Sequence, residues 1–242
     1  MTSAQPRFLA LVPAHDEERR IGWVVDVASR QLPVLVVDDG SADGTATIAR
    51  AAGATVVDQR PNQGKGAALR AGFAAAIESG VEAVITLDGD GQHDPAEIPS
   101  FLAAHALRTV EGVPSELIIG RRDFSRMPLV RRIANTLGTL VLSVALGRYV
   151  PDNQSGYRLV GRRLMREMLA SSEDGFAFEV EMIAVCQREG WPIGWVPIGT
   201  RYGGERSHIR PLAHLREFVA VSWRARRIAR SPRRSGSAED AA

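Results

Sequence analysis

The 242-residue sequence has little cysteine and almost no lysine, since Cys186 and Lys65 are the single residues of each kind. One cysteine excludes an internal disulfide and a zinc site built from several cysteines. The longest apolar run, residues 137–147, is interrupted by two hydroxyl residues and falls far short of the ~20 residues that span a bilayer. No cleavage pattern of a signal peptide follows Met1. We therefore expect a cytoplasmic protein without a transmembrane helix, and attachment to the inner face of the membrane stays open.

Charge is distributed unevenly along the chain, although the formal net charge is only +2. Residues 201–234 hold ten arginines against two glutamates, whereas residues 1–200 hold 20 basic against 24 acidic side chains. Hydrophobic residues make up 45% and charged residues 24%, which excludes a disordered chain. We predict one domain over residues 1–210, followed by a basic helix and a disordered tail over residues 211–242.

Short apolar segments alternate with helical patterns through the first half of the chain. The expected strands are 8–12, 34–37, 55–57, 83–87 and 117–119, and the expected helices are 17–30, 45–52, 66–79 and 95–108. This alternation predicts an α/β fold with a mainly parallel central sheet flanked by helices. In such sheets ligands bind beyond the carboxyl ends of the strands, so the residues after each strand are the candidates for chemistry.

A polar cluster follows each of the five predicted strands, at residues 13–17, 38–44, 62–66, 88–94 and 120–122. In the fourth cluster, Asp88 and Asp90 are two residues apart and Gln92 adds an amide oxygen. Hard divalent cations such as Mg²⁺ or Mn²⁺ prefer such oxygen ligands and share phosphate oxygens readily. The alternative is a turn with an Asx hydrogen bond, in which Asp94 caps the next helix.

The third cluster contains Lys65 between two glycines at the start of a predicted helix. Backbone N–H groups, a lysine and a helix N-terminus together favour a bound phosphate, but a glycine turn that caps the helix explains the segment equally well. Asp39 ends the second strand, where an acid commonly holds ribose hydroxyls. The first strand is not followed by a Gly-x-Gly-x-x-Gly pattern, which disfavours a dinucleotide fold of that kind.

Five arginines and one acid occupy residues 121–132, and Arg131 lies one helical turn before Asn135. Because arginine binds phosphate bidentately, this cluster can be a clamp for a second phosphate. The alternative is a solvated basic face, and both interpretations stay open.

Seven collinear stretches carry a resemblance to a known family. They are PAHDEE (13–18), VVDDGSADGT (36–45), NQGKGAALRAG (62–72), LDGDGQHDP (87–95), GRR (120–122), DNQSGYRL (152–159) and GERSHI (204–209). Together they resemble the family 2 inverting glycosyltransferases with a GT-A fold, and specifically the dolichyl- or polyprenyl-phosphate mannosyl- and glucosyltransferase branch. The resemblance implies a GT-A catalytic domain over residues 1–210. Its reaction would move mannose or glucose from GDP-mannose or UDP-glucose to a polyprenyl phosphate, with Mg²⁺ or Mn²⁺ as cofactor.

The resemblance also implies roles for residues of these stretches. The nucleoside pocket would be lined by Pro13, Ala14, Glu17 and Asp39, and the diphosphate would lie near Lys65. The metal and the sugar diphosphate would be held by Asp88, Asp90 and Gln92. The acceptor phosphate would be received by Arg122, Arg131 and Asn135, with Arg201, Ser207 and His208 closing over it. Catalysis is expected to depend on Asp90, Arg122 and Arg131.

The sequence departs from the family pattern in several places. Asp16-Glu17 stands where relatives usually have Asn-Glu, and Asn135 stands where many have Ser. Gly120-Arg121-Arg122 replaces Gly-Ser-Arg, which leaves open which arginine points inward. Many relatives carry C-terminal membrane helices that are not visible here, so anchoring is expected to be peripheral or supplied by a partner.

The sequence leaves two alternative functions open. One alternative keeps the fold but uses a small soluble molecule or a saccharide, and another is a nucleotide-sugar-binding protein without turnover. A lipid phosphate is already anionic at neutral pH and needs no general base, whereas a hydroxyl acceptor requires one. Glu179 and Glu181 are the nearest candidates for that base, and at most one of them faces the site, because they are two residues apart on a predicted helix.

The segment from Pro211 has the pattern of a basic amphipathic helix. Its apolar stripe consists of Leu212, Leu215, Val219 and Trp223, with Phe218 beside it, and its off-stripe arginines include Arg216, Arg224 and Arg227. Such a helix can lie in an anionic membrane interface, or it can pack its stripe on the body of the protein. No recognised nucleic-acid-binding motif is present, so we expect no nucleic-acid partner.

Overall fold

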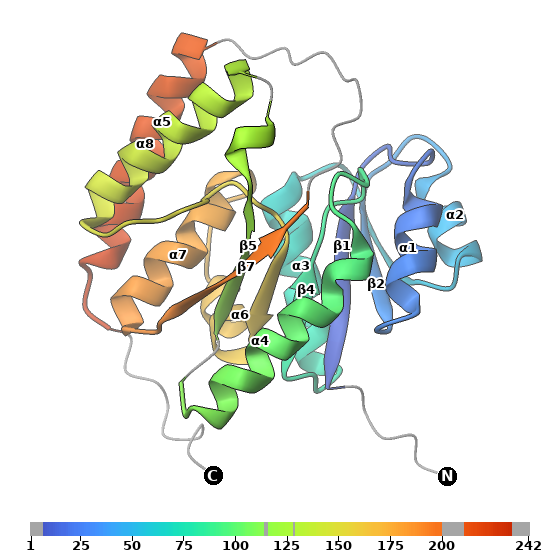
Figure 1. Ribbon diagram of the computed structural model, residues 1–242. Coiled ribbons are helices and arrows are strands. Elements are labelled where there is room, and N and C mark those ends of the chain that lie inside the picture. Colours follow the sequence, from blue (N-terminus) through green and yellow to red (C-terminus); the bar gives the residue numbers. More distant parts are fainter. Residues whose placement is uncertain (1–6, 114–115, 128, 200–210, 234–242) are drawn as a thin grey trace.

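A seven-stranded sheet crosses the molecule, and helices cover both of its faces (Figure 1). The structure is a computed structural model that describes residues 7–113, 116–127, 129–199 and 211–233, with the side chains of all but residues 126, 130, 131 and 211–217. The strands are β1 (Phe8–Ala14), β2 (Val34–Asp39), β3 (Thr55–Gln59), β4 (Ala83–Thr86), β5 (Leu117–Arg122), β6 (Arg158–Gly161) and β7 (Ile193–Ile198). The helices are α1 (Ile21–Ser29), α2 (Thr45–Ala51), α3 (Lys65–Glu78), α4 (Ile98–Val110), α5 (Leu129–Leu146), α6 (Arg162–Met168), α7 (Ala177–Glu189) and α8 (Pro211–Ala229), with short 3-10 turns η1 (Pro95–Glu97) and η2 (Phe124–Arg126).

Six of the seven strands run in the same direction. The order along the sheet is β3-β2-β1-β4-β6-β5-β7, and β6 alone runs antiparallel to its neighbours β4 and β5. Because β6 is antiparallel on both sides, β5 and β7 point the same way as β1 to β4. The carboxyl ends of these six strands therefore lie at one edge. This confirms the predicted α/β fold with a mainly parallel sheet.

All five predicted strands are present, and three of them continue into the polar cluster that follows. For example, β2 includes Asp38 and Asp39, and β5 includes Arg122. The predicted helix at 17–30 begins only at Ile21, and the one at 95–108 starts as the η1 turn before α4. The antiparallel strand β6 was not predicted, because it is only four residues long and begins with a charged residue.

The two faces of the sheet bury different side chains, since successive residues of a strand point to opposite faces. Leu9 and Leu11 of β1 join the core beneath α3, α6 and α7, whereas Ala10 and Val12 join the core beneath α1 and α4. Both faces are therefore filled with apolar side chains, and the strand-end edge is left as the place where polar residues gather.

The C-terminal helix α8 packs against α5 and α7 at the β7 end of the sheet (Figure 1). Phe218, Ser222 and Ala225 are buried in this contact, whereas Val219 and Trp223 are exposed. The alternative in which the predicted stripe packs on the body is therefore wrong for Val219 and Trp223, because the helix buries a neighbouring face.

Parts of the C-terminal predictions cannot be placed. The side chains of Leu212 and Leu215, the boundary at residue 210 and the tail from residue 234 lie outside the described part of the chain. Within that described part, no helix has the length and apolar character needed to cross a membrane.

Candidate functional site

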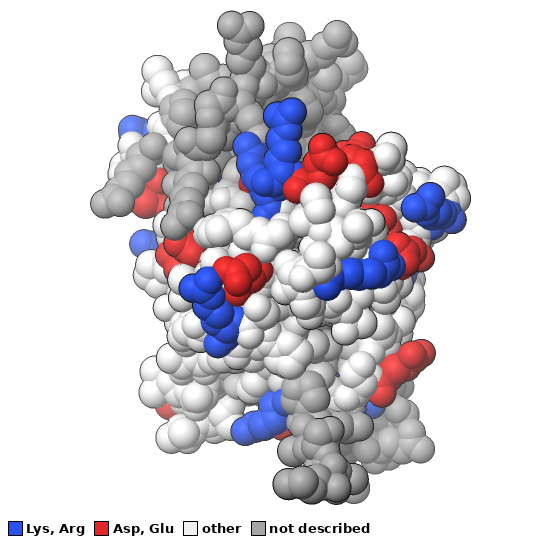
Figure 2. Space-filling view, turned by 90° about the vertical axis from the view of Figure 1, so that its right-hand side faces the viewer, with Lys and Arg blue, Asp and Glu red and all other residues white. Residues whose placement is uncertain are grey.

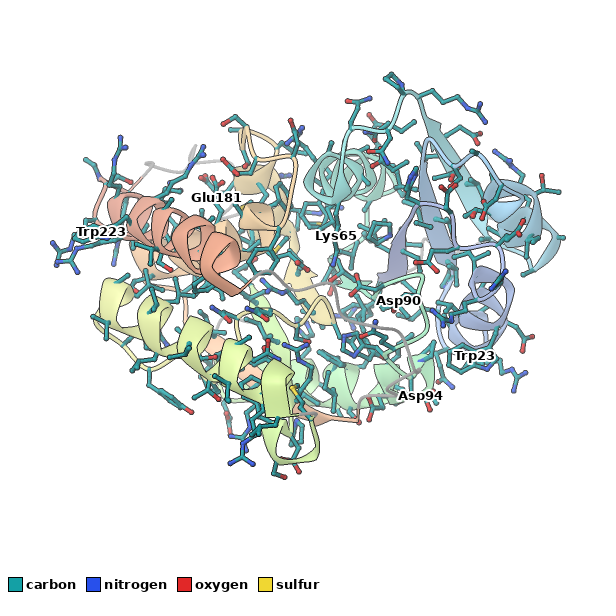
Figure 3. All side chains as sticks on the ribbon, turned by 90° about the horizontal axis from the view of Figure 1, so that it is seen from above. Trp23, Lys65, Asp90, Asp94, Glu181 and Trp223 are labelled. Atoms are coloured by element: carbon teal, nitrogen blue, oxygen red, sulfur yellow. The ribbon has the colours of Figure 1, made fainter. Side chains whose placement is uncertain are left out.

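The polar loops after β1, β2, β4 and β5 meet at the edge seen from above in Figure 3, where Lys65 and Asp90 lie near the centre. Figure 2 shows basic and acidic side chains next to one another near the upper edge of the face turned to the viewer. The loop after β4 touches the end of β1 at Gly89, where an added Cβ would lie 3.3 Å from the Cβ of Ala14 and 3.4 Å from the Cγ of Glu17. The structure therefore brings Ala14 and Glu17 next to the Asp88–Asp90 loop.

Lys65, the first residue of α3, forms ion pairs with carboxylates from two other elements. Its Nζ atom lies 2.6 Å from Oδ1 of Asp88, just after β4, and 3.2 Å from Oε1 of Glu179 on α7. The Glu179 side chain is only 4% exposed, whereas those of Asp88 and Lys65 are 27% and 34% exposed. The single lysine of the sequence thus lies between two carboxylates and remains accessible from the edge of the sheet.

Charge pairing outweighs burial for two members of this group. Burial by itself lowers the pKa of Lys65, but Asp88 and Glu179 raise it well above its ordinary value. Burial by itself raises the pKa of Asp88, but Lys65, with help from His93 and Arg122, brings it below its ordinary value. Lys65 is therefore a cation and Asp88 an anion at neutral pH.

Three backbone N–H groups of the glycine-rich segment are bonded to acceptors of the protein itself. Those of Gln63 and Gly64 donate to the two carboxylate oxygens of Asp39, at 2.8 and 2.7 Å, and that of Gly66 donates to the carbonyl oxygen of Asp174 at 2.7 Å. Gly64 has a φ of +96°, which favours glycine. An added Cβ at either glycine would lie 2.6 Å or less from a carbonyl oxygen. The segment is therefore a turn that leads into α3, and these three N–H groups are not directed at a ligand.

Asp39 ends β2 and is almost fully buried, at 3% exposure. Since both of its carboxylate oxygens accept hydrogen bonds from the 63–64 backbone, it holds in place the turn that presents Lys65. Pro13 and Ala14 are buried at the end of the neighbouring strand β1. The four residues predicted to line a nucleoside pocket thus come from adjacent strand ends.

The loop from Asp88 to Asp94 has the hydrogen bonds of an ordered turn. Oδ1 of Asp90 accepts from the N–H of Gln92 at 2.9 Å, and Asp94 caps η1 by accepting from the N–H of Ala96 at 3.0 Å. This confirms the Asx turn and the cap that the sequence had offered as one alternative. The turn does not exclude a metal, because a carboxylate oxygen has more than one lone pair.

The donor set of this loop fits a hard divalent cation. Asp88, Asp90 and Gln92 offer only oxygen donors. Within the ranges that the structure describes, no three or more His, Cys, Asp or Glu side chains are grouped so as to hold a metal ion. Mg²⁺ usually binds through one or two carboxylates together with the phosphate oxygens of a substrate. The residues present therefore fit an ion that a diphosphate helps to hold.

Arg122, at the end of β5, is the inward-pointing arginine of the Gly-Arg-Arg motif. Its Nε and Nη2 atoms donate to the two carboxylate oxygens of Asp152, at 2.8 and 2.9 Å, and its backbone N–H donates to the same group at 3.2 Å. Asp152 is fully buried, whereas the neighbouring Arg121 is exposed. The structure thus decides between the two arginines, which the sequence had left open.

The other residues predicted for an acceptor phosphate are only partly placed. Arg131 lies in the first turn of α5, but its side chain is not described. Asn135 lies one turn later, and its Nδ2 atom is 3.1 Å from the sulfur of Met127. Arg201 and Ser207, together with His208, lie outside the described residues.

Two charged residues that hold the site together, Asp152 and Arg158, had no predicted role. Arg158 is fully buried on β6 and donates to the carbonyl oxygens of Ser155, Glu179 and Asn153 at 2.8, 2.5 and 3.1 Å. It therefore joins β6, α7 and the loop between α5 and β6. The available signals were the DNQSGYRL stretch (152–159), which contains both residues, and an arginine directly before the apolar pair Leu159-Val160.

Glu179 faces the site, and Glu181 does not. Glu181 accepts a hydrogen bond from the hydroxyl of Ser171 at 2.8 Å and lies away from Lys65 in Figure 3. The Glu179 carboxylate is buried and paired with Lys65, so it is already engaged. This arrangement argues against either residue as a general base for a hydroxyl acceptor.

A family model and two relatives that match this chain are named as glycosyltransferases. The family model for Glycosyl transferase family 2 matches residues 10–169. The undecaprenyl-phosphate mannosyltransferase of Micrococcus luteus is 30% identical over 207 residues, which cover 79% of this chain and 82% of that protein. The UDP-N-acetylglucosamine–dolichyl-phosphate N-acetylglucosaminyltransferase of Methanococcus voltae is 27% identical over 213 residues, covering 79% and 84%.

A solved structure is similar over most of the fold. Glucosyl-3-phosphoglycerate synthase from Mycobacterium tuberculosis, in complex with Mn²⁺, UDP-glucose and glycerol 3-phosphate, matches with a TM-score of 0.70 and 26% identity. The match covers 92% of this chain and 80% of that one.

Proposed function

The chain belongs to glycosyl transferase family 2, and from that premise we propose that it transfers a hexose from a nucleotide sugar to a polyprenyl phosphate. It is a glycosyltransferase with the GT-A fold that the sequence predicted. Relatives named for the same kind of reaction use undecaprenyl or dolichyl phosphate. The proposed donors remain GDP-mannose and UDP-glucose, and peripheral attachment at the inner face of the membrane is part of the proposal.

The observation that carries the proposal is the meeting of opposite charges at one sheet edge. Asp88 and Asp90 follow β4, Lys65 reaches Asp88 from α3, and Arg122 ends β5. Only β6 separates β4 from β5 in the sheet, and the charges of both Lys65 and Arg122 lower the pKa of Asp88. The donor diphosphate and the acceptor phosphate are both anions, so each needs a cation nearby if the two substrates are to react. Lys65 and Arg122 are two cations at this edge.

The proposed acceptor accounts for the lack of an evident general base among the described residues of the site. A lipid phosphate is anionic at neutral pH, so its oxygen can attack the anomeric carbon without losing a proton. Attack from the face opposite the leaving diphosphate inverts that carbon. Arg122, held bidentately by buried Asp152, would orient the acceptor phosphate and reduce the repulsion between the two anions. The further acceptor contacts that we propose are Arg131, Asn135, Arg201 and Ser207.

On the donor side, Asp88, Asp90 and Gln92 would hold Mg²⁺ or Mn²⁺ together with the diphosphate. When bound, such an ion supplies positive charge where the leaving group becomes more negative. Lys65 adds a fixed positive charge at the same place, since Glu179 and Asp88 keep it protonated and oriented. Pro13, Ala14, Glu17 and Asp39 would line the nucleoside side of the pocket.

A second candidate acceptor is a small soluble phosphorylated molecule. The similar M. tuberculosis synthase was solved with glycerol 3-phosphate, which has a phosphate group, as a lipid phosphate does. Arg122 would serve either acceptor. A binding protein without turnover is disfavoured, because Asp88, Asp90 and Arg122 are all present.

Partition of a labelled sugar tests the proposal. The protein is incubated with labelled GDP-mannose or UDP-glucose, Mg²⁺ or Mn²⁺, and either a polyprenyl phosphate in detergent or glycerol 3-phosphate. Label extracted into organic solvent with the polyprenyl phosphate supports the proposal. Label transferred only to the soluble acceptor replaces it by the second candidate, and no transfer to either acceptor contradicts both. Thermal stabilisation by one donor in the presence of metal would identify the donor.

A further inference from the structure

Helix α5 carries a stripe of large apolar side chains that point into solvent. The stripe consists of Leu129, Ile133, Leu137, Leu140 and Val144, whose exposure lies between 46% and 68%. Their spacing of three or four residues places them on one side of the helix, which we call the outer face of α5. Leu142 and Leu146 on the other side are buried in the core. The helix is therefore apolar on two sides, and only one of them is covered by the described chain.

Trp223 of α8 is exposed near the last turn of α5. Its side chain is 61% exposed, and the guanidinium carbon of Arg226 lies 5.6 Å from the centre of its ring. The same guanidinium donates to the carbonyl oxygen of Ala145 at 2.9 Å, so Trp223 is held beside the end of α5. Scattered exposed leucines are normal, but five exposed apolar side chains along one side of a helix, with an exposed tryptophan near its last turn, indicate an interaction surface.

Charge indicates the kind of partner. Residues 124–151 contain four arginines and no aspartate or glutamate. A second copy of this chain would bring two such basic segments together, which costs electrostatic energy. An anionic bilayer surface is complementary to them. Trp223 and Tyr149, which is 74% exposed, are residue types that favour the boundary between lipid and water.

We propose that the outer face of α5, with Trp223 at its end, lies in the interface of an anionic lipid bilayer. An 18-residue helix is ~27 Å long, so it would lie in the plane of the interface. From the sequence, one alternative was a membrane contact through the apolar stripe of α8. We instead assign the membrane contact mainly to α5, with exposed Trp223 of α8 beside it. The proposal rests on the proposed function, which includes peripheral attachment to a membrane, and it names the face that makes the contact.

Vesicle flotation tests the proposal. The probes are vesicles of equal parts phosphatidylcholine and phosphatidylglycerol, compared with pure phosphatidylcholine. The test variant is Leu140→Glu with Val144→Glu on α5. The matched control is Leu107→Glu with Val110→Glu on α4, whose side chains are 60% and 86% exposed. All four positions are exposed, so both variants are expected to unfold near the same temperature as the parent protein.

We expect the parent and the α4 variant to float with the anionic vesicles and the α5 variant to bind at least tenfold more weakly. Donor-induced thermal stabilisation is expected to be the same in all three proteins. If none of them bound a nucleotide sugar, the proposed function would be contradicted, but the flotation result would still test the membrane contact. A parent protein that does not float, or equal flotation of both variants, overturns the proposal. A parent dimer that the α5 variant splits, without flotation, assigns the face to a contact between copies and also overturns it.

Discussion

The ammonium group of Lys65 lies 2.6 Å from Oδ1 of Asp88, so the only lysine of the chain faces the first carboxylate of the Asp-Gly-Asp motif. The two residues come from the start of α3 and the end of β4. Glu179 holds the same ammonium group from α7. Because three separate elements meet at one cation, the site is organised before a substrate arrives, and substitutions there should affect catalysis more than folding.

Replacement of Asp90 by asparagine should lower the rate of sugar transfer by about a hundredfold, because it removes one of two carboxylates proposed to hold the metal. A chelator should lower the rate of the parent protein to a similar level and have little further effect on the variant. The control is Asp26→Asn, which changes an exposed carboxylate on α1 that pairs with Arg30. A transfer rate that is unchanged in Asp90→Asn would contradict the site assignment.

Glu179→Gln should lower kcat by about tenfold, equivalent to about 1.4 kcal/mol, because Lys65 loses one of its two carboxylate partners. The backbone carbonyl that accepts from Arg158 is retained, so the fold should be preserved. Glu181→Gln, on the same helix but bonded to Ser171, should leave kcat unchanged.

The pH profile separates positioning by Glu179 from general-base catalysis. With a positioning role, the acid limb of the kcat profile should stay in place in Glu179→Gln. A loss of more than about a hundredfold together with the disappearance of that limb would show that Glu179 is a base after all.

Arg122→Ala should lower the free energy of unfolding by about 3–5 kcal/mol, because it leaves the fully buried carboxylate of Asp152 without its ion pair. Arg121→Ala, at the exposed neighbour, should change it by less than about 0.5 kcal/mol. Denaturant unfolding measures both values. In the double variant Arg122→Met with Asp152→Leu, stability should partly return while transfer stays low. Recovery of transfer in that variant would exclude a role for Arg122 at the acceptor.

Gly156→Ala should reduce transfer by more than about tenfold while destabilising the fold by only about 1 kcal/mol. The added Cβ would lie 2.7 Å from Oδ2 of Asp88 and 2.9 Å from Nζ of Lys65, and these side-chain ends can move apart. The matched control is Gly175→Ala, where an added Cβ has no atom within 4 Å. Parallel kinetic and thermal measurements check the prediction, and equal activity of both variants would contradict it.

Much of the site could be predicted because its residues follow recognisable strands. Apolar runs such as Val34–Val37 predict buried strands, and parallel strands place the residues after them at one edge. The positions of Asp88, Lys65 and Arg122 therefore predict that they lie at one edge of the sheet, and the family resemblance adds their roles in one site. The glycine-rich segment was less certain, because a phosphate cradle and a turn that caps a helix use the same residues, and only the hydrogen bonds to Asp39 and Asp174 distinguish them.

By itself the sequence determined the fold class and the family, and it predicted the loops of the candidate site, because local periodicity and short motifs encode these features. The tertiary structure alone decided which charges meet. Lys65 pairs with Glu179, Arg122 with Asp152, and α8 buries a different face from the one its own pattern suggested. These contacts join residues far apart in the chain, and their energies depend on burial and distance, which exist only once the sheet and its helices have packed.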